Sequence, residues 1–296
     1  MWGLAKLEGG KPALMVDGKL YPLAALAASS GKALPSSNVA MFADWERSRA
    51  ALVDLAASAA KSGVAPVEGR LLAPLLYPGK VLCAGANYYD HMAEMGFPGV
   101  RKETQRLFFF FKPPRNAIVG PGATVVMPRG TQKYDWEIEL AAVIGKTARY
   151  VPVETALSHV AGYTVAIDMS ARDFNQAPDQ FYKFDWVAGK ATDTACPMGP
   201  WIVPAEVLGD VQNVALKLAV NGVVKQDSST SQMIYSVAEQ IARASQLMTL
   251  DPGDVILTGT PAGVGVPKGT FLKPGDKIDA EIAGIGKLSV EIKPPL

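Results

Sequence analysis

Residues 135–145 of this chain read Asp-Trp-Glu-Ile-Glu-Leu-Ala-Ala-Val-Ile-Gly. The first half alternates polar with apolar residues and the second half is continuously apolar, which is typical of a strand that enters a core. Residues two apart on a strand share a face, so Glu137 and Glu139 are expected to point the same way. We therefore predict a buried strand over residues 136–145 that carries two adjacent carboxylates.

Two interpretations of this carboxylate pair are open. Neighbouring carboxylates repel each other and resist burial unless a positive charge lies between them. A hard divalent cation with oxygen ligands, such as Mg²⁺, would supply that charge and keep open positions for water or substrate. The alternative is an exposed strand face with two solvated glutamates. The apolar run at residues 140–144 counts against exposure and favours the buried interpretation.

The sequence around this strand predicts a domain made mostly of short strands. Apolar stretches bounded by Gly and Pro recur along it, and Asn221-Gly222 is a strong hairpin signal within residues 215–225. An amphipathic helix is expected from Ser228 or Ser229 to about Met248. This pattern indicates a β-rich α+β fold. The other predicted strands span residues 79–86, 107–112, 160–168, 254–260, 276–282 and 287–292.

The first 75 residues have a different character. Residues 2–26 alternate short apolar stretches with Gly and Lys, which indicates small strands and turns. Asp44 is positioned to cap a helix that runs to about Lys61. A buried strand from residue 79 then opens a larger unit. We therefore predict a small N-terminal domain at residues 1–75 and a second domain at residues 76–296.

The composition argues against several classes of protein. With 296 residues, 49% hydrophobic and 19% charged, the chain can bury a large core. A net charge of +1 gives no electrostatic case for nucleic-acid binding. We expect no membrane segment and no signal peptide, because the longest early apolar run, residues 23–28, is too short to span a bilayer. Cys83 and Cys196 are too few for a disulfide framework, which favours the reducing cytoplasm.

Three further features could belong to a polar site, and each also has a plainer explanation. Asp168 ends an apolar stretch and is either a helix cap or a site residue. Lys190 follows Gly189 and could bind an anion or stabilise an enolate, although most lysines are simply solvated. Residues 259–265 are Gly-rich without the Lys-Ser or Lys-Thr of a phosphate loop. They could bind a carboxylate through backbone N–H groups or form an ordinary turn.

His91 is the candidate general base. In a helix, His91 and Glu94 are i, i+3 neighbours, and a carboxylate beside an imidazole orients the ring and raises its basicity. The chain has two histidines, and we interpret the other one, His159, as structural. Gly, Pro and charged residues interrupt residues 88–106, so we expect this segment to be a mobile lid that carries the base.

In their order along the chain, these motifs and several others resemble the fumarylacetoacetate hydrolase family over residues 79–293. The match is highly specific as a set. The motifs that carry it are Gly85-x-Asn87-Tyr88, Asp90-His91-x-x-Glu94-Met95-Gly96, Phe111-Lys112-Pro113, Gly120-Pro121-Gly122, Asp135-x-Glu137-x-Glu139-Leu140, Val143-Ile144-Gly145, Gly162-Tyr163, Asp168-x-Ser170-Ala171-Arg172-Asp173, Gly189-Lys190, Cys196-Pro197-x-Gly199-Pro200, Asn221-Gly222 and Pro252-Gly253-Asp254-Val255-Ile256-Leu257-Thr258-Gly259-Thr260-Pro261-x-Gly263-Val264-Gly265.

The resemblance implies a mixed β-sandwich roll as the catalytic domain, usually in a homodimer, with a small N-terminal α/β cap domain. It implies a divalent cation held by Glu137, Glu139 and Asp168, with Mg²⁺ expected and Mn²⁺ or Ca²⁺ as alternatives. The pair formed by His91 and Glu94 matches the dyad of the acylpyruvate hydrolase and oxaloacetate decarboxylase branch, carried on a lid helix. Further positions match substrate-facing residues of the family, namely Lys190, Arg172, Thr260, and Asn175 or Gln176, where some members place a glutamine.

The resulting hypothesis is hydrolysis of a C–C bond in a small 1,3-dicarbonyl or acylpyruvate-type 2-oxo acid. His91, oriented by Glu94, activates the attacking water, while Lys190 and the cation stabilise the departing enolate. Alternatives on the same metal site are decarboxylation or keto–enol tautomerisation of an oxaloacetate-like acid, or a sugar-acid hydrolase or dehydratase. A non-catalytic carboxylate-binding protein is a further alternative, which the presence of a base disfavours. Candidates for the pocket wall are Phe181, Tyr182, Phe184 and Trp186.

Overall fold

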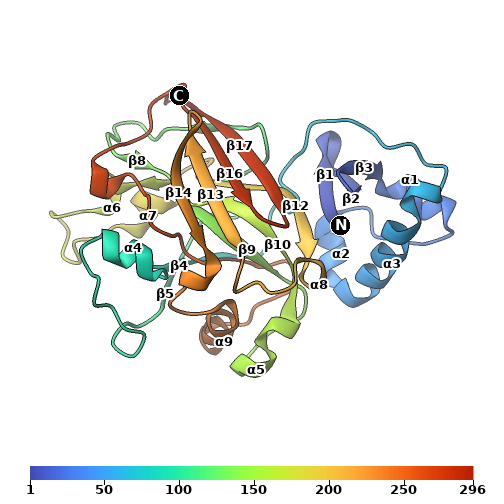
Figure 1. Cartoon of the computed structure of the whole chain (residues 1–296), viewed down its shortest axis with the longest axis horizontal. Coiled ribbons are helices and arrows are strands. Elements are labelled where there is room, and N and C mark those ends of the chain that lie inside the picture. The colour runs from blue at the N-terminus through green and yellow to red at the C-terminus, as the bar shows by residue number, and fades with distance from the viewer. Residues whose placement is uncertain (296) are drawn as a thin grey trace.

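A sheet of ten strands forms the centre of the computed structural model, which describes residues 1–295. In Figure 1 the N-terminal elements, in blue, lie at one end of the long axis of the molecule. In order across the sheet the strands are β3 (Lys19–Pro22), β2 (Lys11–Val16), β1 (Trp2–Leu7), β12 (Cys196–Pro204), β10 (Val160–Ile167), β9 (Ile138–Ile144), β15 (Val255–Leu257), β4 (Val81–Gly85) and β5 (Phe108–Phe111), and β6 (Ile118–Val119) pairs with β12.

A second sheet of five strands covers part of the first one. Ile138 and Val165 from the large sheet share a buried cluster with Leu218 and Ile278 from the small one. A two-stranded ribbon, β8 (Tyr134–Asp135) with β11 (Ser170–Ala171), lies beside them. This architecture confirms the predicted β-rich α+β class. The strands of the second sheet are β14 (Val223–Ser229), β13 (Ala215–Val220), β16 (Lys277–Ile282), β17 (Gly286–Lys293) and β7 (Thr124–Val126).

The helices are short and lie around the sheets. Among residues 1–295, no helix is long and apolar enough to cross a bilayer. The helices are α1 (Leu23–Ser29), α2 (Asn38–Ala43), α3 (Trp45–Ser58), α4 (Tyr89–Glu94), α5 (Val153–Ala156), α6 (Arg172–Asn175), α7 (Trp186–Lys190), α8 (Ala205–Leu208) and α9 (Val237–Leu247).

The N-terminal elements pack onto the large sheet. Strand β1 pairs antiparallel with β12, with Leu4 opposite Ile202. Leu4, Phe42 and Leu52 belong to the same buried cluster as Val143 of β9. The first 75 residues therefore share a core with the rest of the chain, and the division at residue 75 stays a prediction.

The predicted hairpin at Asn221-Gly222 is confirmed. The two residues have φ values of 51° and 77°, and β13 and β14 pair antiparallel on either side of them. Positive φ at both central positions is the requirement of a type I′ turn, and Asn-Gly meets it at low steric cost.

Several predicted boundaries were wrong for local reasons. The central strand begins at Ile138, not Trp136, because side chains bind the backbone before it: Asp135 accepts from the Trp136 N–H, and Gln226 accepts from the Ile138 N–H. Ser228 and Ser229 still belong to β14, and the predicted helix starts only at Val237.

Helix α9 begins where Ser236 and Glu239 form a reciprocal capping box, which satisfies two of the free N–H groups at its start.

Two further local predictions also needed correction. Residues 23–29 form α1 and not a strand. Asp44 precedes α3 as predicted, but its side chain makes no capping hydrogen bond.

Candidate metal centre

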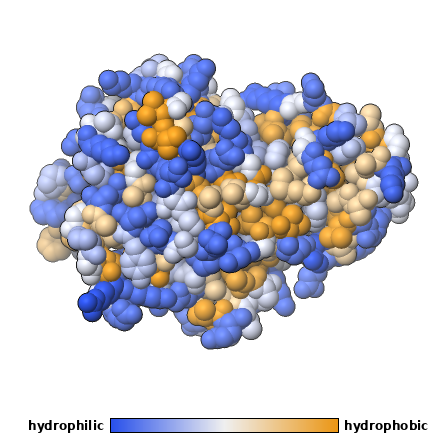
Figure 2. Space-filling view, in the orientation of Figure 1, coloured by the Kyte–Doolittle hydropathy of each residue, from blue (hydrophilic) through white to orange (hydrophobic). Residues whose placement is uncertain are grey.

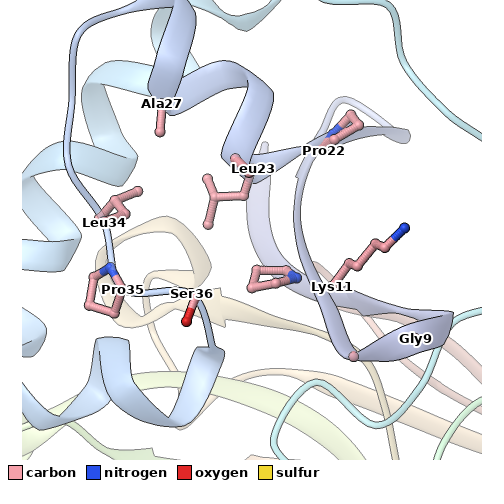
Figure 3. A pocket seen from close by; sticks show the side chains of 11 residues that line it. Gly9, Lys11, Pro22, Leu23, Ala27, Leu34, Pro35 and Ser36 are labelled. Atoms are coloured by element: carbon pink, nitrogen blue, oxygen red, sulfur yellow. The ribbon is translucent and has the colours of Figure 1, made fainter.

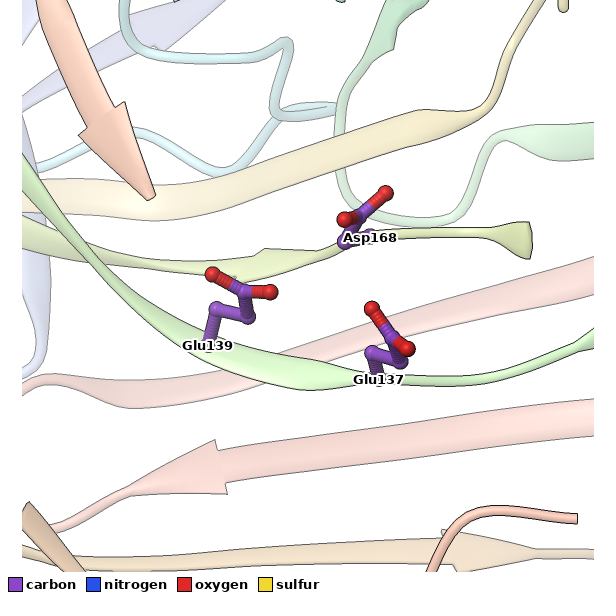
Figure 4. Close-up of side chains that lie close together, drawn as sticks. All are labelled: Glu137, Glu139 and Asp168. Atoms are coloured by element: carbon purple, nitrogen blue, oxygen red, sulfur yellow. The ribbon is translucent and has the colours of Figure 1, made fainter. Parts of the chain in front are cut away.

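Three buried carboxylates meet on neighbouring strands. Ala166 of β10 lies opposite Glu139 of β9, and the Asp168 N–H donates to the Glu137 carbonyl at 2.8 Å. Paired residues share a face of the sheet, so this register brings Asp168 to the side that holds both glutamates. Figure 4 shows the three side chains converging, and one oxygen of each lies within 4.8 Å of the others.

Three basic side chains neutralise most of this negative charge. The Lys190 ammonium lies 2.6 Å from Glu137 Oε2 and 2.8 Å from Asp168 Oδ2. The fully buried Lys112 lies 2.8 Å from Asp168 Oδ1. Arg172 bridges Glu137 Oε1 at 2.6 Å and Asp135 Oδ2 at 2.9 Å. Four acidic groups thus meet three basic groups, and one negative charge stays uncompensated.

That charge belongs to Glu139. Within residues 1–295, the hydrogen-bond donor to its carboxylate is the Gly259 N–H at 2.6 Å, and no basic side chain forms an ion pair with it. Burial raises the pKa of Glu139 well above its usual range, and repulsion from Asp168 and Glu137 adds to the effect. A nearby cation would stabilise the ionised form of a buried carboxylate that has no basic partner.

Glu137 and Lys190, in contrast, are stabilised in their charged forms. Burial alone would raise the pKa of Glu137, but Arg172 and Lys190 outweigh it and hold that pKa below the usual range. Burial alone would lower the pKa of Lys190, but Asp168 and Glu137 raise it above the usual value. Glu137 therefore stays ionised and Lys190 stays protonated.

The donor set fits a hard divalent cation. Carboxylate oxygens are the ligands that Mg²⁺ and Mn²⁺ prefer. One carboxylate oxygen from each of Glu137, Glu139 and Asp168 lies within 4.8 Å of the other two, so each residue can offer one oxygen to a cation. Glu139 supplies the uncompensated charge. The residues expected to hold a cation, Glu137, Glu139 and Asp168, are thus brought together as a possible ligand set.

The predicted dyad of His91 and Glu94 is formed, and His91 lies in the same site as the three carboxylates. His91 on α4 places Nδ1 at 2.9 Å from Glu94 Oε1, and Glu94 Oε2 accepts from the Gly263 N–H at 2.8 Å. An Nδ1–H donated to the carboxylate leaves Nε2 as the basic nitrogen. The other histidine, His159, is half-buried and contacts the carbonyls of Lys146 and Thr147, as a structural residue would.

A cavity of about 140 Å³ is lined by both His91 and the three carboxylates. It is much smaller than the pockets of roughly 300–1,000 Å³ that hold drug-sized ligands, which indicates a compact ligand. Aromatic rings of Phe108, Phe110 and Trp186 form one wall. Its polar lining residues are His91, Glu137, Glu139, Asp168, Arg172, Asn175, Lys190 and Thr260.

Four residues considered at this site lie outside the cavity. Gln176 is exposed and does not line the cavity, whereas its neighbour Asn175 does. Phe181 and Tyr182 are 89% and 81% exposed, so they were wrong as pocket walls. They lie in the loop between α6 and α7. Phe184 stacks on Trp186 from outside the cavity, with ring centroids 6.0 Å apart.

Thr260 lines the cavity, but its hydroxyl is already engaged. Its O–H donates to the Ile138 carbonyl at 2.8 Å and accepts from Gln226 Nε2 at 2.9 Å. Gln226 is fully buried and also binds the Ile138 N–H and the Pro261 carbonyl. The pair therefore ties the Gly-rich loop at residues 259–265 to the start of β9.

Sequence reasoning assigned no role to Lys112 or Asp135. Lys112 also donates to the Met169 and Lys190 carbonyls, so one ammonium joins the segments that carry Asp168 and Lys190. Asp135 accepts from the Gly265 N–H at 2.7 Å while it binds Arg172. Two signals were available in the sequence. Lys112 ends an apolar strand directly before two prolines, and Asp135 is a third acid in the alternation that contains Glu137 and Glu139.

Comparison with known proteins now adds to this geometry. The sequence profile "Fumarylacetoacetate (FAA) hydrolase C-terminal" matches residues 80–293. The chain belongs to the fumarylacetoacetate hydrolase family. The match begins just before β4 and ends with β17, so it includes every residue of the carboxylate cluster and the dyad.

Several members of the family that are named for an activity are similar to this chain. The mitochondrial oxaloacetate tautomerase FAHD2A of Bos taurus is 44% identical over 221 residues, which cover 74% of this chain and 68% of the bovine protein. The maleylpyruvate hydrolase of Sphingobium sp. SYK-6, solved with manganese(II) and pyruvate, shares 30% identity at a TM-score of 0.77, covering 100% of both chains.

A second solved hydrolase carries the same ligands. The fumarylpyruvate hydrolase of Pseudomonas aeruginosa, in complex with Mn²⁺ and pyruvate, has 36% identity and a TM-score of 0.65, covering 78% of this chain and 91% of its own. The fold prediction and the family resemblance are therefore confirmed. Family structures bind a divalent metal, and this chain has a carboxylate triad suited to one.

Proposed function

We propose that this chain is a metal-dependent hydrolase that cleaves a C–C bond in a small acylpyruvate-type 2-oxo acid or 1,3-dicarbonyl compound. One observation carries the proposal: His91, hydrogen-bonded to Glu94, lines the same cavity as the carboxylates Glu137, Glu139 and Asp168. A general base beside a metal site serves the activation of water, which simple binding of a carboxylate does not require.

The cation expected at Glu137, Glu139 and Asp168, which we propose to be Mg²⁺ with Mn²⁺ as a substitute, would supply Lewis-acid polarisation of the substrate oxygens. It would also turn the single uncompensated negative charge of the cluster into a net positive one. That change suits a substrate with a carboxylate. Arg172, Asn175 and Thr260 line the cavity and are proposed to shape the substrate site.

The chain's own groups then account for the proton and electron movements. His91 Nε2 takes a proton from water, while Glu94 holds the ring through Nδ1–H. The hydroxide oxygen bonds to the distal carbonyl carbon, and the C–C bond to the pyruvate unit breaks. The bonding electrons become a pyruvate enolate, which the Lys190 ammonium stabilises, and the protonated His91 returns a proton to its carbon. The products are pyruvate and a carboxylic acid.

Tautomerisation or decarboxylation of oxaloacetate is the second candidate. Two observations favour it: the 44% identity to a relative named as an oxaloacetate tautomerase, and a cavity of about 140 Å³ that suits a four-carbon acid. Neither reaction needs an attacking water. Proton transfer by His91 and enolate stabilisation by Lys190 would be sufficient.

A substrate panel separates the two candidates. Acylpyruvates, oxaloacetate and 2,4-dioxo sugar acids are assayed with Mg²⁺, with Mn²⁺ and with chelator. Pyruvate release from an acylpyruvate, abolished by chelator, supports the hydrolase. Enol–keto conversion of oxaloacetate without C–C hydrolysis of any acylpyruvate would replace it with the tautomerase, and turnover of the sugar acids alone would replace both.

Location and assembly are part of the same proposal. Cys83 and Cys196 are both free and buried, as suits the reducing cytoplasm that we propose. The bovine relative is named as mitochondrial, so fractionation of the native host is the deciding measurement. We also propose a homodimer, which sedimentation equilibrium of the purified chain tests.

A further inference from the structure

Cavities larger than the catalytic one lie outside the metal centre. One, of about 480 Å³, lies among the N-terminal elements, and Figure 3 shows Leu23 and Ala27 of α1 on its border. Among the described residues, Lys11 is the one charged residue in its lining. Another, of about 440 Å³, lies where the end of the segment at residues 88–106 meets α9 and the start of α5. Charged residues from two segments line this second cavity, so it is the better candidate for a site that binds an ion.

One face of α9 forms a wall of the 440 Å³ cavity. Its lining residues on the helix are three or four positions apart, which places them on one side: Glu239, Ala242, Arg243 and Gln246. Leu107 and residues 151–153 add an apolar lining. Figure 2, in the orientation of Figure 1, shows hydrophilic and hydrophobic residues side by side on the surface near α5 and α9. The cavity therefore combines charge with apolar surface.

The lining of this cavity carries a net positive charge. Arg106 and Arg243 both line it, and within residues 1–295 no carboxylate lies within ion-pair distance of either guanidinium group. The acidic lining residue, Glu239, is already bound, because it pairs with Lys102 and accepts from the Ser236 N–H at 2.9 Å. Guanidinium groups bind oxyanions strongly, through paired N–H donors. The two arginines therefore predict an anionic ligand.

Tyr235 connects this cavity to the segment that we expect to be mobile. It lines the cavity, and its hydroxyl contacts the carbonyl oxygens of Lys102 and Gln105 near the end of the segment. Its backbone N–H donates to Asn87 Oδ1 at 2.9 Å, and its carbonyl accepts from Asn87 Nδ2 at 3.0 Å, just before the segment starts. A ligand that bridges Arg106 to α9 would therefore hold the end of the segment in place.

We propose that this cavity binds a phosphate monoester with a small apolar body. Its phosphate group carries close to two negative charges at neutral pH and three acceptor oxygens, which matches two guanidinium groups without acidic partners. The apolar body would lie against Leu107 and residues 151–153. The volume of about 440 Å³ is within the roughly 300–1,000 Å³ of small-molecule sites. A monocarboxylate would match the charge of only one arginine.

The binding test uses phenyl phosphate, inorganic phosphate and benzoate as probes of the full chain. Calorimetric titration is performed with Mn²⁺ and oxalate present, so that the catalytic cavity is occupied. We expect phenyl phosphate to bind most tightly, because it offers both the dianion and the apolar body. Arg106→Gln and Arg243→Gln should each weaken its binding about tenfold or more, through the loss of charge-assisted hydrogen bonds. Arg101→Gln, at an exposed position of the same segment outside the cavity, should match the wild type.

Hydrogen exchange measures the effect on the segment, in metal-loaded protein without oxalate. Phenyl phosphate should slow exchange across residues 100–106 in the wild type but not in Arg243→Gln. Arg106 is exposed and Arg243 is half-buried, so both variants should fold. Absence of phenyl phosphate binding, equal affinity for benzoate, or unchanged affinity in both arginine variants overturns the proposal. Unchanged exchange on binding overturns the link to the segment. None of these measurements depends on hydrolase activity, so this proposal and the proposed function can fail separately.

Discussion

Nδ1 of His91 lies 2.9 Å from Oε1 of Glu94, and the other oxygen of the same carboxylate accepts from the Gly263 N–H at 2.8 Å. Glu94 therefore joins helix α4 to the Gly-rich loop at residues 259–265. The orientation of the proposed base depends on a contact between segments about 170 residues apart in sequence, which the i, i+3 spacing alone does not determine.

We expect His91→Ala to lose C–C hydrolysis by about 10²-fold or more, the usual contribution of a general base, while Mn²⁺ affinity is retained. Glu94→Gln should lose less, because a glutamine can still accept from the ring. Steady-state kinetics and metal titration measure both effects. Glu103→Gln, an exposed acid on the same segment, is the matched control. Normal hydrolysis by His91→Ala would place the base elsewhere.

Glu139→Gln should raise the stability of the metal-free protein, because it removes the one buried carboxylate without a basic partner. Asp168→Asn should lower that stability by about 3–5 kcal/mol, because it leaves buried Lys112 and Lys190 without this partner. Both variants should lose the rise in Tm on addition of Mn²⁺. Thermal unfolding with chelator and with Mn²⁺ checks these signs. An unchanged Mn²⁺ response in both variants would rule out the assigned ligands.

Lys112→Met replaces a fully buried ammonium by an apolar chain of similar length. We expect a loss of about 3–5 kcal/mol in the free energy of unfolding, since Asp168 loses a buried counter-charge. Weaker Mn²⁺ binding should follow, because Lys112 also binds the carbonyls of Met169 and Lys190 beside the ligand. Denaturant titration and calorimetry measure the two effects. Lys268→Met, at an exposed position, should change neither.

The segment at residues 88–106 is held at its start, where Asp90 and Glu94 accept from Ser228 and the Gly263 N–H, and at its end, where Lys102 pairs with Glu239. We still predict mobility in solution, because residues 95–99 between these contacts are all exposed. Hydrogen exchange across residues 88–106 should be fast in the metal-loaded protein and slow after addition of oxalate. Strong protection in both states would mean a preformed site.

Glu239 provides a prediction of pH dependence. Burial alone would raise its pKa, but hydrogen bonds from Lys102 and Ser236 together outweigh burial and hold the pKa below the usual 4.5. A depressed carboxyl pKa contributes stability above the unfolded pKa, and this contribution is lost as pH falls through the folded pKa. Between pH 5 and pH 3, roughly the range around that pKa, the wild type should therefore lose more stability than Glu239→Gln, which retains a residue suited to a capping box. Parallel pH profiles of Tm would contradict this assignment.

Much of the site was predictable because its signals are local. The alternation at residues 135–140 places Glu137 and Glu139 on one side, and Asn221-Gly222 meets the backbone demand of its hairpin. Helical spacing brings His91 to Glu94. Gln176 and the ring of Phe181 could not be placed in this way, because their loop has no repeating geometry that would set the direction of its side chains.

The sequence by itself therefore determined the β-rich class, the family, the two glutamates on one strand and the dyad on one helix, since each depends on short periodicities or on ordered motifs. Only the tertiary structure decided that Asp168 lies opposite Glu137, that Lys112 reaches Asp168 from another strand, and that Glu139 is left without a basic partner. The physical reason is that strand register and packing bring together groups far apart in the chain. The charge balance of a buried cluster depends on all of those groups at once.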